Sequence, residues 1–257
     1  MPKFAANLTM MFVEWPFLDR FKAAADAGFK AVEFLFPYEH AAESIADELQ
    51  KNGLKQALFN LPPGDWAKGE RGLAALPERS AEFEKSVDQA IHYAVELKTP
   101  CLHMMSGLAD KSNGHAVASY RKALEFAGRA AAPHGINIVI EPINARDMPG
   151  YFLNDFSFAA NLIADLALPN LKLQYDIYHR QILHGDVMIS LEKLMPIIGH
   201  VQIASVPKRH EPLSGELDDR RIFHHLDNLG YKGFVGCEYR PANGTLAGLR
   251  WLGDLEK

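Results

Sequence analysis

The sequence is poor in cysteine, in long apolar runs and in targeting signals. Its two cysteines, Cys101 and Cys237, both stand inside strand-like apolar runs, which favours two buried free thiols in a reducing compartment over a disulfide framework. No run approaches the roughly 18 apolar residues that a membrane-spanning helix needs. Residues 1–8 lack the basic segment, apolar stretch and small-residue cleavage site of a signal peptide. We therefore expect a cytoplasmic protein that does not enter a membrane.

Positive charge is also scarce. Lysine and arginine total 27 against 32 aspartates and glutamates, so the formal net charge is -5 at pH 7. This balance argues against nucleic acid as the main partner, although it leaves room for a local basic pocket that binds a small anion. With 48% apolar and 23% charged residues, the composition is that of an ordinary globular protein.

One apolar run ends abruptly at a carboxylate. Residues 137–140 include three successive β-branched side chains, which suit a strand covered on both faces. Glu141 follows, and Pro142 then removes a backbone donor and ends the pairing. A charged side chain at the carboxyl end of a buried parallel strand is where α/β folds place their chemistry. Glu141 is therefore a candidate catalytic or metal-binding group.

Three later strand-like runs also end on a polar side chain: residues 171–176 on Asp176, 197–202 on Gln202 and 233–238 on Glu238. Asp176 follows Glu141 by 35 residues, Gln202 follows Asp176 by 26, and Glu238 follows Gln202 by 36. A strand-helix unit with short loops needs about that many residues. If these are strands 5 to 8 of a barrel, all four side chains converge on one mouth and could hold one ion.

The whole chain alternates strand-like and helix-like segments. The earlier strands are predicted at residues 3–8, 29–36, 54–61 and 101–105. Helices are predicted at residues 17–27, 41–52, 81–97, 116–132, 156–166, 190–194, 222–229 and 248–257. Eight such units without a linker predict a single α/β domain over residues 1–257, a (β/α)8 TIM barrel, for which roughly 250 residues is typical. The segment at about residues 62–79 shows neither the helical nor the strand spacing of apolar residues. We expect it to form an ordered lid.

The four convergent side chains form an all-oxygen ligand set. Three carboxylates and one amide oxygen suit Mg²⁺ or Mn²⁺ better than a structural zinc. Without an ion the carboxylates would repel one another, and at least one would keep its proton. A divalent ion of this kind polarises a carbonyl and stabilises the enediolate that forms when the neighbouring carbon loses a proton. A ketose-type or 2-oxo-acid isomerase is the natural reaction class.

Other polar residues near these strand ends each have two interpretations. Asp176 is as well placed to cap the following helix as to bind an ion. His179, three residues later, is equally suited to the site or to a helix cap. Asn144 fits a loop residue that bonds its own backbone better than it fits a substrate contact. His200 lies deeper than Gln202 on the same inward side and fits a buried supporting histidine.

Two arginines are candidates for binding a substrate carboxylate. Arg209, with His210 beside it, belongs to the loop after the seventh strand, a common anion-binding position in barrels; the alternative there is a solvated surface charge. Arg71 lies in the lid and carries a guanidinium that matches a carboxylate with two parallel hydrogen bonds. The candidate substrate-binding residues are Arg71, Glu70, His179 and Arg209.

With these residues identified, the chain resembles the hydroxypyruvate isomerase family, a branch of the xylose-isomerase-like barrels that includes the 2-oxo-tetronate isomerases. The resemblance covers essentially the whole length and rests on the strings at residues 4–8, 32–38, 63–72, 140–144, 174–179, 200–204 and 209–212. It implies that Glu141 and Glu238 are catalytic, and that Glu141, Asp176, Gln202 and Glu238 form the metal position. Broader relatives among the sugar epimerases carry a histidine at Gln202, and this departure weakens a zinc interpretation.

The resemblance implies an isomerase that interconverts hydroxypyruvate and 2-hydroxy-3-oxopropanoate through an enediolate, with Mg²⁺ or Mn²⁺ as cofactor. One of Glu141 and Glu238 would take a proton from C3, and the other would return one to C2. The alternative substrate is a four-carbon 2-oxo-tetronate. More distant alternatives are a sugar epimerase, a non-catalytic sugar-acid binding barrel and a zinc-dependent endonuclease. The expected partner is a small 2-oxo-hydroxy acid, without nucleic acid or membrane, and a homo-oligomer is left open.

Overall fold

The computed structural model of the protein describes residues 1–255 and contains a closed barrel of eight parallel strands. The strands pair in sequence order, and β8 returns to pair with β1. Their bounds are β1 (Lys3–Asn7), β2 (Ala31–Glu33), β3 (Lys55–Asn60), β4 (Cys101–His103), β5 (Asn137–Ile140), β6 (Leu171–Asp176), β7 (Ile198–Gln202) and β8 (Phe234–Cys237). The predicted (β/α)8 TIM barrel is confirmed.

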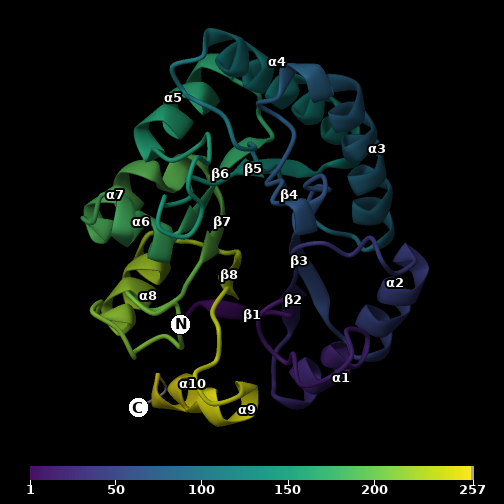
Figure 1. Ribbon diagram of the computed structural model, residues 1–257. Coiled ribbons are helices and arrows are strands. Elements are labelled where there is room, and N and C mark those ends of the chain that lie inside the picture. Colours follow the sequence, from purple (N-terminus) through teal and green to yellow (C-terminus); the bar gives the residue numbers. More distant parts are fainter. Residues whose placement is uncertain (256–257) are drawn as a thin grey trace.

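Helices form an outer ring around these strands (Figure 1). Their bounds are α1 (Asp19–Asp26), α2 (Ala42–Lys51), α3 (Ser80–Glu96), α4 (Gly114–Ala131), α5 (Phe156–Leu166), α6 (Ile177–Leu183), α7 (Val187–Leu194), α8 (Asp219–Asn228), α9 (Thr245–Gly248) and α10 (Arg250–Asp254). In α10, Trp251 packs edge-on against Phe4 of β1, so the ring is completed between α8 and α1. Over residues 1–255, none of the helices has the length and apolar character to cross a membrane.

The helix faces follow the apolar spacing of the sequence. In α2 the buried residues are Ala42, Ile45 and Leu49, which recur at helical spacing and turn one stripe toward the sheet. In α5, which begins where it was predicted, the Asp155 carboxylate accepts the backbone N–H of Phe158 and caps the helix. Local sequence therefore determines where these helices begin and which side they bury.

The structure corrects the predictions at several strand and helix ends. The strand predicted at residues 29–36 is regular only over β2, and the one at 101–105 only over β4, although single backbone hydrogen bonds to the next strand continue as far as Leu35 and Met104. Helix α6 was not predicted, and α7 begins three residues before the predicted 190–194. Of the helix predicted at 248–257, the structure forms α10; α9 precedes it and ends at Gly248, and residues 256–257 lie outside the described residues.

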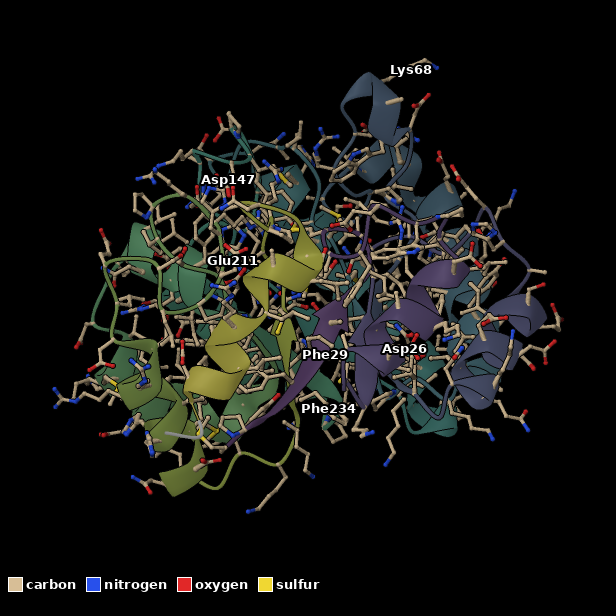
Figure 2. The ribbon with its side chains drawn as sticks, turned by 90° about the horizontal axis from the view of Figure 1, so that it is seen from below. Asp26, Phe29, Lys68, Asp147, Glu211 and Phe234 are labelled. Atoms are coloured by element: carbon tan, nitrogen blue, oxygen red, sulfur yellow. The ribbon has the colours of Figure 1, made fainter. Side chains whose placement is uncertain are left out.

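The segment predicted as a lid contains two short 3-10 helices, η1 (Trp66–Lys68) and η2 (Pro77–Arg79). Gly72 has a φ of 113° and pairs with Ser106, and a Cβ there would collide with the backbone of the strand loop at Met105. Figure 2 shows Lys68 at the edge of the molecule, on the same side as Asp147 of the loop after β5. The segment therefore stands at the end of the barrel where the strands finish.

Candidate active site

A cavity of about 590 Å³ opens among the loops that follow the carboxyl ends of the strands. Its lining includes Glu141, Gln202 and Glu238, three of the four polar residues that the sequence placed at strand ends. The fourth, Asp176, is 1% exposed and lies 3.6 Å from His179, which also lines the cavity. The structure therefore brings the predicted strand ends to one mouth.

The three carboxylates of this site are buried and crowd one another. Burial raises the pKa of Glu141 well above its ordinary value, and the nearby charges of Glu238 and Asp176 raise it further. Burial also raises the pKa of Glu238 to about 8 and that of Asp176 to about 6, even though Arg209 acts in the opposite direction on both. At neutral pH at least one of these groups therefore keeps its proton in the metal-free chain.

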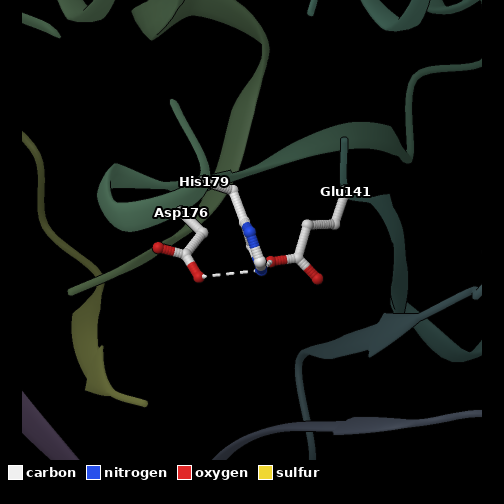
Figure 3. A group of neighbouring side chains, drawn as sticks. All are labelled: Glu141, Asp176 and His179. Atoms are coloured by element: carbon white, nitrogen blue, oxygen red, sulfur yellow. Dashed lines mark ion pairs between the residues drawn. The ribbon is translucent and has the colours of Figure 1, made fainter. Parts of the chain in front are cut away.

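Three side chains are close enough to hold one metal ion. One ligand atom from each of Glu141, Asp176 and His179 lies within 4.8 Å of the other two (Figure 3). The Oε1 atom of Glu141 and the Oδ2 atom of Asp176 are buried and have no hydrogen-bond partner among residues 1–255. Two orphaned carboxylate oxygens at one point fit a divalent cation, because a bound ion would give both of them a partner. The structure adds His179 to this group, a residue that the sequence assigned to substrate binding.

Asp176 fulfils both of its sequence interpretations with different oxygens. Its Oδ1 atom accepts the backbone N–H of Tyr178 at 2.7 Å and caps α6. Its Oδ2 atom faces Nε2 of His179 at 3.6 Å, the ion pair that is drawn in Figure 3. The cap fixes the rotamer of the side chain, and the fixed rotamer directs the second oxygen into the site.

Arg209 lies among the acids of the mouth. Its guanidinium lies 3.1 Å from Glu238, 3.2 Å from Asp147 and 3.8 Å from Asp176. It also lies over the ring of Tyr178, 5.0 Å from the centroid. Burial works against its charge, but the surrounding carboxylates raise its pKa above the ordinary value. The backbone at Arg209 is held at a φ of 56°, a left-handed conformation that is often found at functional sites.

The family follows from comparison with known proteins. Residues 21–255 match the family model described as xylose isomerase-like TIM barrel. The chain belongs to this family. Its relatives include the 2-oxo-tetronate isomerase of Cupriavidus necator, which is 54% identical, and the hydroxypyruvate isomerase of Escherichia coli, which is 42% identical. Each of these alignments covers 98% of both chains.

A solved structure supports the same assignment of fold. A Brucella melitensis protein named AP endonuclease, family 2, is 48% identical to this chain, and the two superpose with a TM-score of 0.96 over 99% of each. The named relatives reported above are isomerases, and this xylose isomerase-like barrel is an isomerase as well.

The loop at residues 62–79 of this xylose isomerase-like barrel, which the sequence predicts to be a lid, contributes Arg71 to the cavity. The guanidinium of Arg71 stacks on Trp66 at 3.9 Å from the ring centroid, and both residues line the cavity. Glu70 is placed differently, because its carboxylate binds the guanidinium of Arg79 and the backbone N–H of Asp65. The geometry thus gives Glu70 a contact inside the lid, and its contact with substrate stays a prediction.

Sequence reasoning missed Glu33, which is fully buried in β2 of this barrel. Its carboxylate accepts three side-chain hydrogen bonds, from Asn7 at 2.9 Å, His200 at 2.7 Å and Gln202 at 2.8 Å. The predicted supporting role of His200 is therefore seen in the structure. The signal for Glu33 was present, because it is the one acid inside the otherwise apolar run at residues 31–36.

The same polar layer fixes the amide of Gln202. While its Nε2 atom donates to Glu33, its Oε1 atom accepts from Nε2 of Gln174 at 2.6 Å. His103, for which the sequence suggested no role, lies next to this layer, with Nε2 3.6 Å from a carboxylate oxygen of Glu141. Burial lowers the pKa of His103 to about 3, so its ring is neutral.

Proposed function

We propose that this isomerase acts, with the help of a metal, on a short 2-oxo-3-hydroxy acid and converts it to the 2-hydroxy-3-oxo acid. The observation that carries the proposal is the pair of buried glutamates, Glu141 and Glu238, which border one cavity beside the guanidinium of Arg209. An isomerisation of this kind needs one group that takes a proton from carbon and another that returns one. It also needs a cation for the substrate carboxylate, a role that suits Arg209 and Arg71.

The residues of the mouth fit a divalent cation. Glu141 and Asp176 each present a buried oxygen without a partner, and Gln202 and Glu238 border the same cavity. We infer that these four residues hold the ion, and their oxygen atoms favour Mg²⁺ or Mn²⁺. When bound, such an ion supplies positive charge beside the oxygens that become negative as the carbon-bound proton leaves.

The two glutamates move the carbon-bound proton. One carboxylate takes the proton from C3, the electron pair forms an enediolate, and the other glutamate delivers a proton to C2. The hydroxyl proton of O3 ends on O2, so atoms and charge balance. In the metal-free chain, burial raises the pKa of Glu238 to about 8 and that of Glu141 well above its ordinary value, so both carboxyl groups can carry a proton near neutral pH.

Of the two substrates, the four-carbon 2-oxo-tetronate is the one we favour. The relative that is named for this substrate is 54% identical to the chain, against 42% for the named hydroxypyruvate isomerase. The cavity of about 590 Å³ also has room for the additional hydroxymethyl group of the four-carbon acid. Hydroxypyruvate, which the sequence placed first, is the alternative substrate.

We further propose that the enzyme works in the cytoplasm. Both Cys101 and Cys237 are free and buried, and burial raises the pKa of each thiol. Thiols of this kind are typical of a protein that stays in a reducing compartment.

The test is the ratio of kcat/KM for a 2-oxo-tetronate to that for hydroxypyruvate, measured on metal-stripped protein with and without Mg²⁺ or Mn²⁺. The proposal predicts turnover that depends on the added ion and a higher kcat/KM for the four-carbon acid. A preference for hydroxypyruvate would reassign the substrate. Failure on both acids with either ion would contradict the proposed function.

A nuclease is the second candidate, because the similar Brucella melitensis structure carries an endonuclease name. A metal-dependent nuclease of this kind needs a histidine-rich zinc cluster and a basic surface. The metal group found among residues 1–255 contains one histidine, and the chain has a net charge of -5. Cleavage of a duplex with an abasic site by the zinc-loaded protein, without any isomerase activity, would favour the nuclease.

A further inference from the structure

The lining of the active-site cavity has a charged part and an uncharged part. All of its acids and cations come from the chain between Arg71 and Arg240. The described residues that line the cavity before Arg71 include an uncharged group at the ends of β1, β2 and β3. We call this group the neutral wall, and its members are Asn7, Met10, Phe34, Leu35, Leu58 and Asn60. A substrate with an anionic end and an uncharged end therefore meets two different surfaces.

Four members of the neutral wall are apolar and two carry a side-chain amide. The amide of Asn7 already has a protein partner at each end. Its nitrogen donates to the carboxylate of Glu33 at 2.9 Å, and its oxygen accepts the backbone N–H of Thr9 at 3.1 Å. Asn7 is therefore committed to the hydrogen bonds that join the strands inside the barrel.

Asn60, the last residue of β3, is different. It follows Leu58 by two residues, and both line the cavity, as the alternation of side chains along a strand requires. Its backbone is held firmly, because its N–H donates to the carbonyl of Leu35 at 2.8 Å and its carbonyl accepts the hydroxyl of Tyr38 at 2.7 Å. The residue is 6% exposed, yet its side-chain amide has no hydrogen-bond partner among residues 1–255.

An amide in this position points to a polar group on the substrate. Water can bind the amide while the cavity is open to solvent. Once a substrate expels that water, the amide is left unpaired among apolar side chains, which is costly unless the substrate supplies a partner. A side-chain amide both donates and accepts, and so does a hydroxyl group. The neutral wall thus suits a hydroxymethyl group, with its carbon on the apolar side chains and its oxygen on Asn60.

The place of β3 in the barrel indicates which end of the substrate it meets. β3 and β7 are four strands apart in the closed ring of eight and lie on opposite sides of the barrel (Figure 1). Arg209, in the loop after β7, is suited to the substrate carboxylate. Arg71 is less free, because its Nη1 atom donates to the carbonyls of Trp66 at 3.1 Å and Glu70 at 2.7 Å. With the carboxylate at Arg209, the other end of the acid lies toward Asn60.

We propose that Asn60 determines the preference for chain length, because its side-chain amide hydrogen-bonds the C4 hydroxyl of a 2-oxo-tetronate while the apolar side chains of the neutral wall pack against C4. The inference deepens the proposed function and rests on it for the orientation of the acid. Hydroxypyruvate ends at C3, so it brings no group to Asn60 and leaves the amide without a partner on the substrate.

The test compares kcat/KM of the native chain and of Asn60→Leu for a 2-oxo-tetronate, for hydroxypyruvate and for 2-oxo-3-hydroxybutanoate, which has a methyl group in place of the hydroxymethyl group. Leucine keeps a branched side chain and removes both the donor and the acceptor. The ratio of kcat/KM for the tetronate to that for hydroxypyruvate should fall about 10- to 100-fold, because the C4 hydroxyl loses its partner. The native chain should prefer the tetronate to the methyl acid, and the variant should prefer the methyl acid.

Two further variants separate this effect from a general loss of structure. Asn60→Ala also removes the amide but cannot crowd the cavity, and it should lower the same ratio. Asn228→Leu makes the first substitution at the exposed end of α8 and should leave all three values of kcat/KM unchanged. A lowered ratio in either Asn60 variant supports the proposal. An unchanged ratio in both Asn60 variants, whether the three acids lose activity equally or not at all, would overturn it.

Binding of acids that lack an oxo group distinguishes this outcome from failure of the proposed function. Calorimetry with the Mg²⁺-loaded protein compares 2,3,4-trihydroxybutanoate with 2,3-dihydroxybutanoate, which differ only in the C4 hydroxyl. The native chain should bind the trihydroxy acid about 10-fold more tightly, and Asn60→Leu should lose this difference. That result without turnover of any oxo acid would retain the role of Asn60 and reject the reaction. Equal affinity of the native chain for the two acids, or no binding of either, would overturn the proposal.

Discussion

At the scale of single residues, Glu141 lies between two neutral histidines. The Nε2 atom of His103 is 3.6 Å from one of its oxygens, and that of His179 is 3.9 Å from the other. Burial lowers the pKa of both histidines, so neither ring offers a positive charge, and the pKa of Glu141 stays high. In the metal-free chain the site therefore holds a carboxyl group that takes up a proton readily.

Replacing Glu141 or Glu238 with glutamine should lower kcat by about 10²- to 10⁴-fold, since each variant loses one of the two proton carriers. The metal-free Glu141→Gln protein should unfold at a temperature no lower than that of the native chain, because the carboxyl group it loses has a raised pKa and is costly to ionise. Steady-state kinetics and thermal unfolding check both points. Glu43→Gln, on the exposed side of α2, is the matched control. A near-native kcat in both Glu141→Gln and Glu238→Gln would contradict the two-glutamate scheme.

The two oxygens of Asp176 allow metal binding to be separated from helix capping. Asparagine caps a helix as well as aspartate does, so Asp176→Asn should keep α6 and lose only the charge at the metal position. In the native chain, Mn²⁺ at 100 times its Kd should add about 2.7 kcal/mol of stability. Thermal unfolding with and without Mn²⁺ should show this increase in the native chain and little of it in the variant. An equal increase in both would remove Asp176 from the metal position.

At the scale of elements, hydrogen bonds between buried polar side chains connect strands across the inside of the barrel. Asn7 of β1, Glu33 of β2 and Gln202 of β7 meet inside it, and the carboxylate of Glu33 accepts from residues of both other strands. A Cβ on Gly236 of β8 would collide with the Glu33 carboxylate, so a glycine there gives Glu33 its space. The interior near the mouth thus depends on hydrogen bonds as well as on apolar packing.

Removing this carboxylate should be costly. Glu33→Ala leaves the side chains of Asn7, His200 and Gln202 buried without their acceptor, and we expect a loss of about 3–5 kcal/mol in the free energy of unfolding. Urea denaturation measures this loss, and Glu43→Ala on the surface provides the comparison. A change below about 1 kcal/mol would show that the layer rearranges around the missing group.

Some strand ends and helices could be predicted from the sequence, and others could not. The strand end at Glu141 was found because a run of apolar residues stops there at a polar one, and Asp176 was found because it ends a strand-like run 35 residues later. Helix α6 was missed because its seven residues follow Asp176, the last residue of β6, directly, so strand and helix meet without a loop. The bonds of Glu33 join residues up to 169 positions apart, and such pairing has no periodic signal in the sequence.

At the scale of the whole molecule, charge is distributed unevenly. The chain carries a net charge of -5, yet five cationic residues line the cavity: Arg71, Arg146, Lys208, Arg209 and Arg240. An acidic surface with a basic mouth attracts a small anion more readily than a long polyanion. The same cavity is also lined by Glu141, Asp147 and Glu238, so cationic side chains outnumber acidic ones there without excluding them.

This distribution predicts a dependence on salt. Lys208→Gln and Arg240→Gln should each lower kcat/KM for the anionic substrate a few-fold with little change in kcat, because these exposed side chains act mainly on binding. The native kcat/KM should fall as ionic strength rises, and it should fall less steeply in the variants. The measurement is kcat/KM across a salt series. If kcat/KM falls with ionic strength as steeply in the variants as in the native chain, Lys208 and Arg240 do not steer the substrate.

In the proposed reaction one carboxylate removes the proton from C3 of a 2-oxo-hydroxy acid, and a second carboxylate delivers a different proton to C2. These two proton transfers can be followed by turnover of a 2-oxo-tetronate in D2O by the Mn²⁺-loaded protein and mass spectrometry of the product. We expect deuterium at C2 of the product in the native chain, and none above background in Glu141→Gln or Glu238→Gln. Binding of the acid without any deuterium incorporation would contradict the proposed reaction.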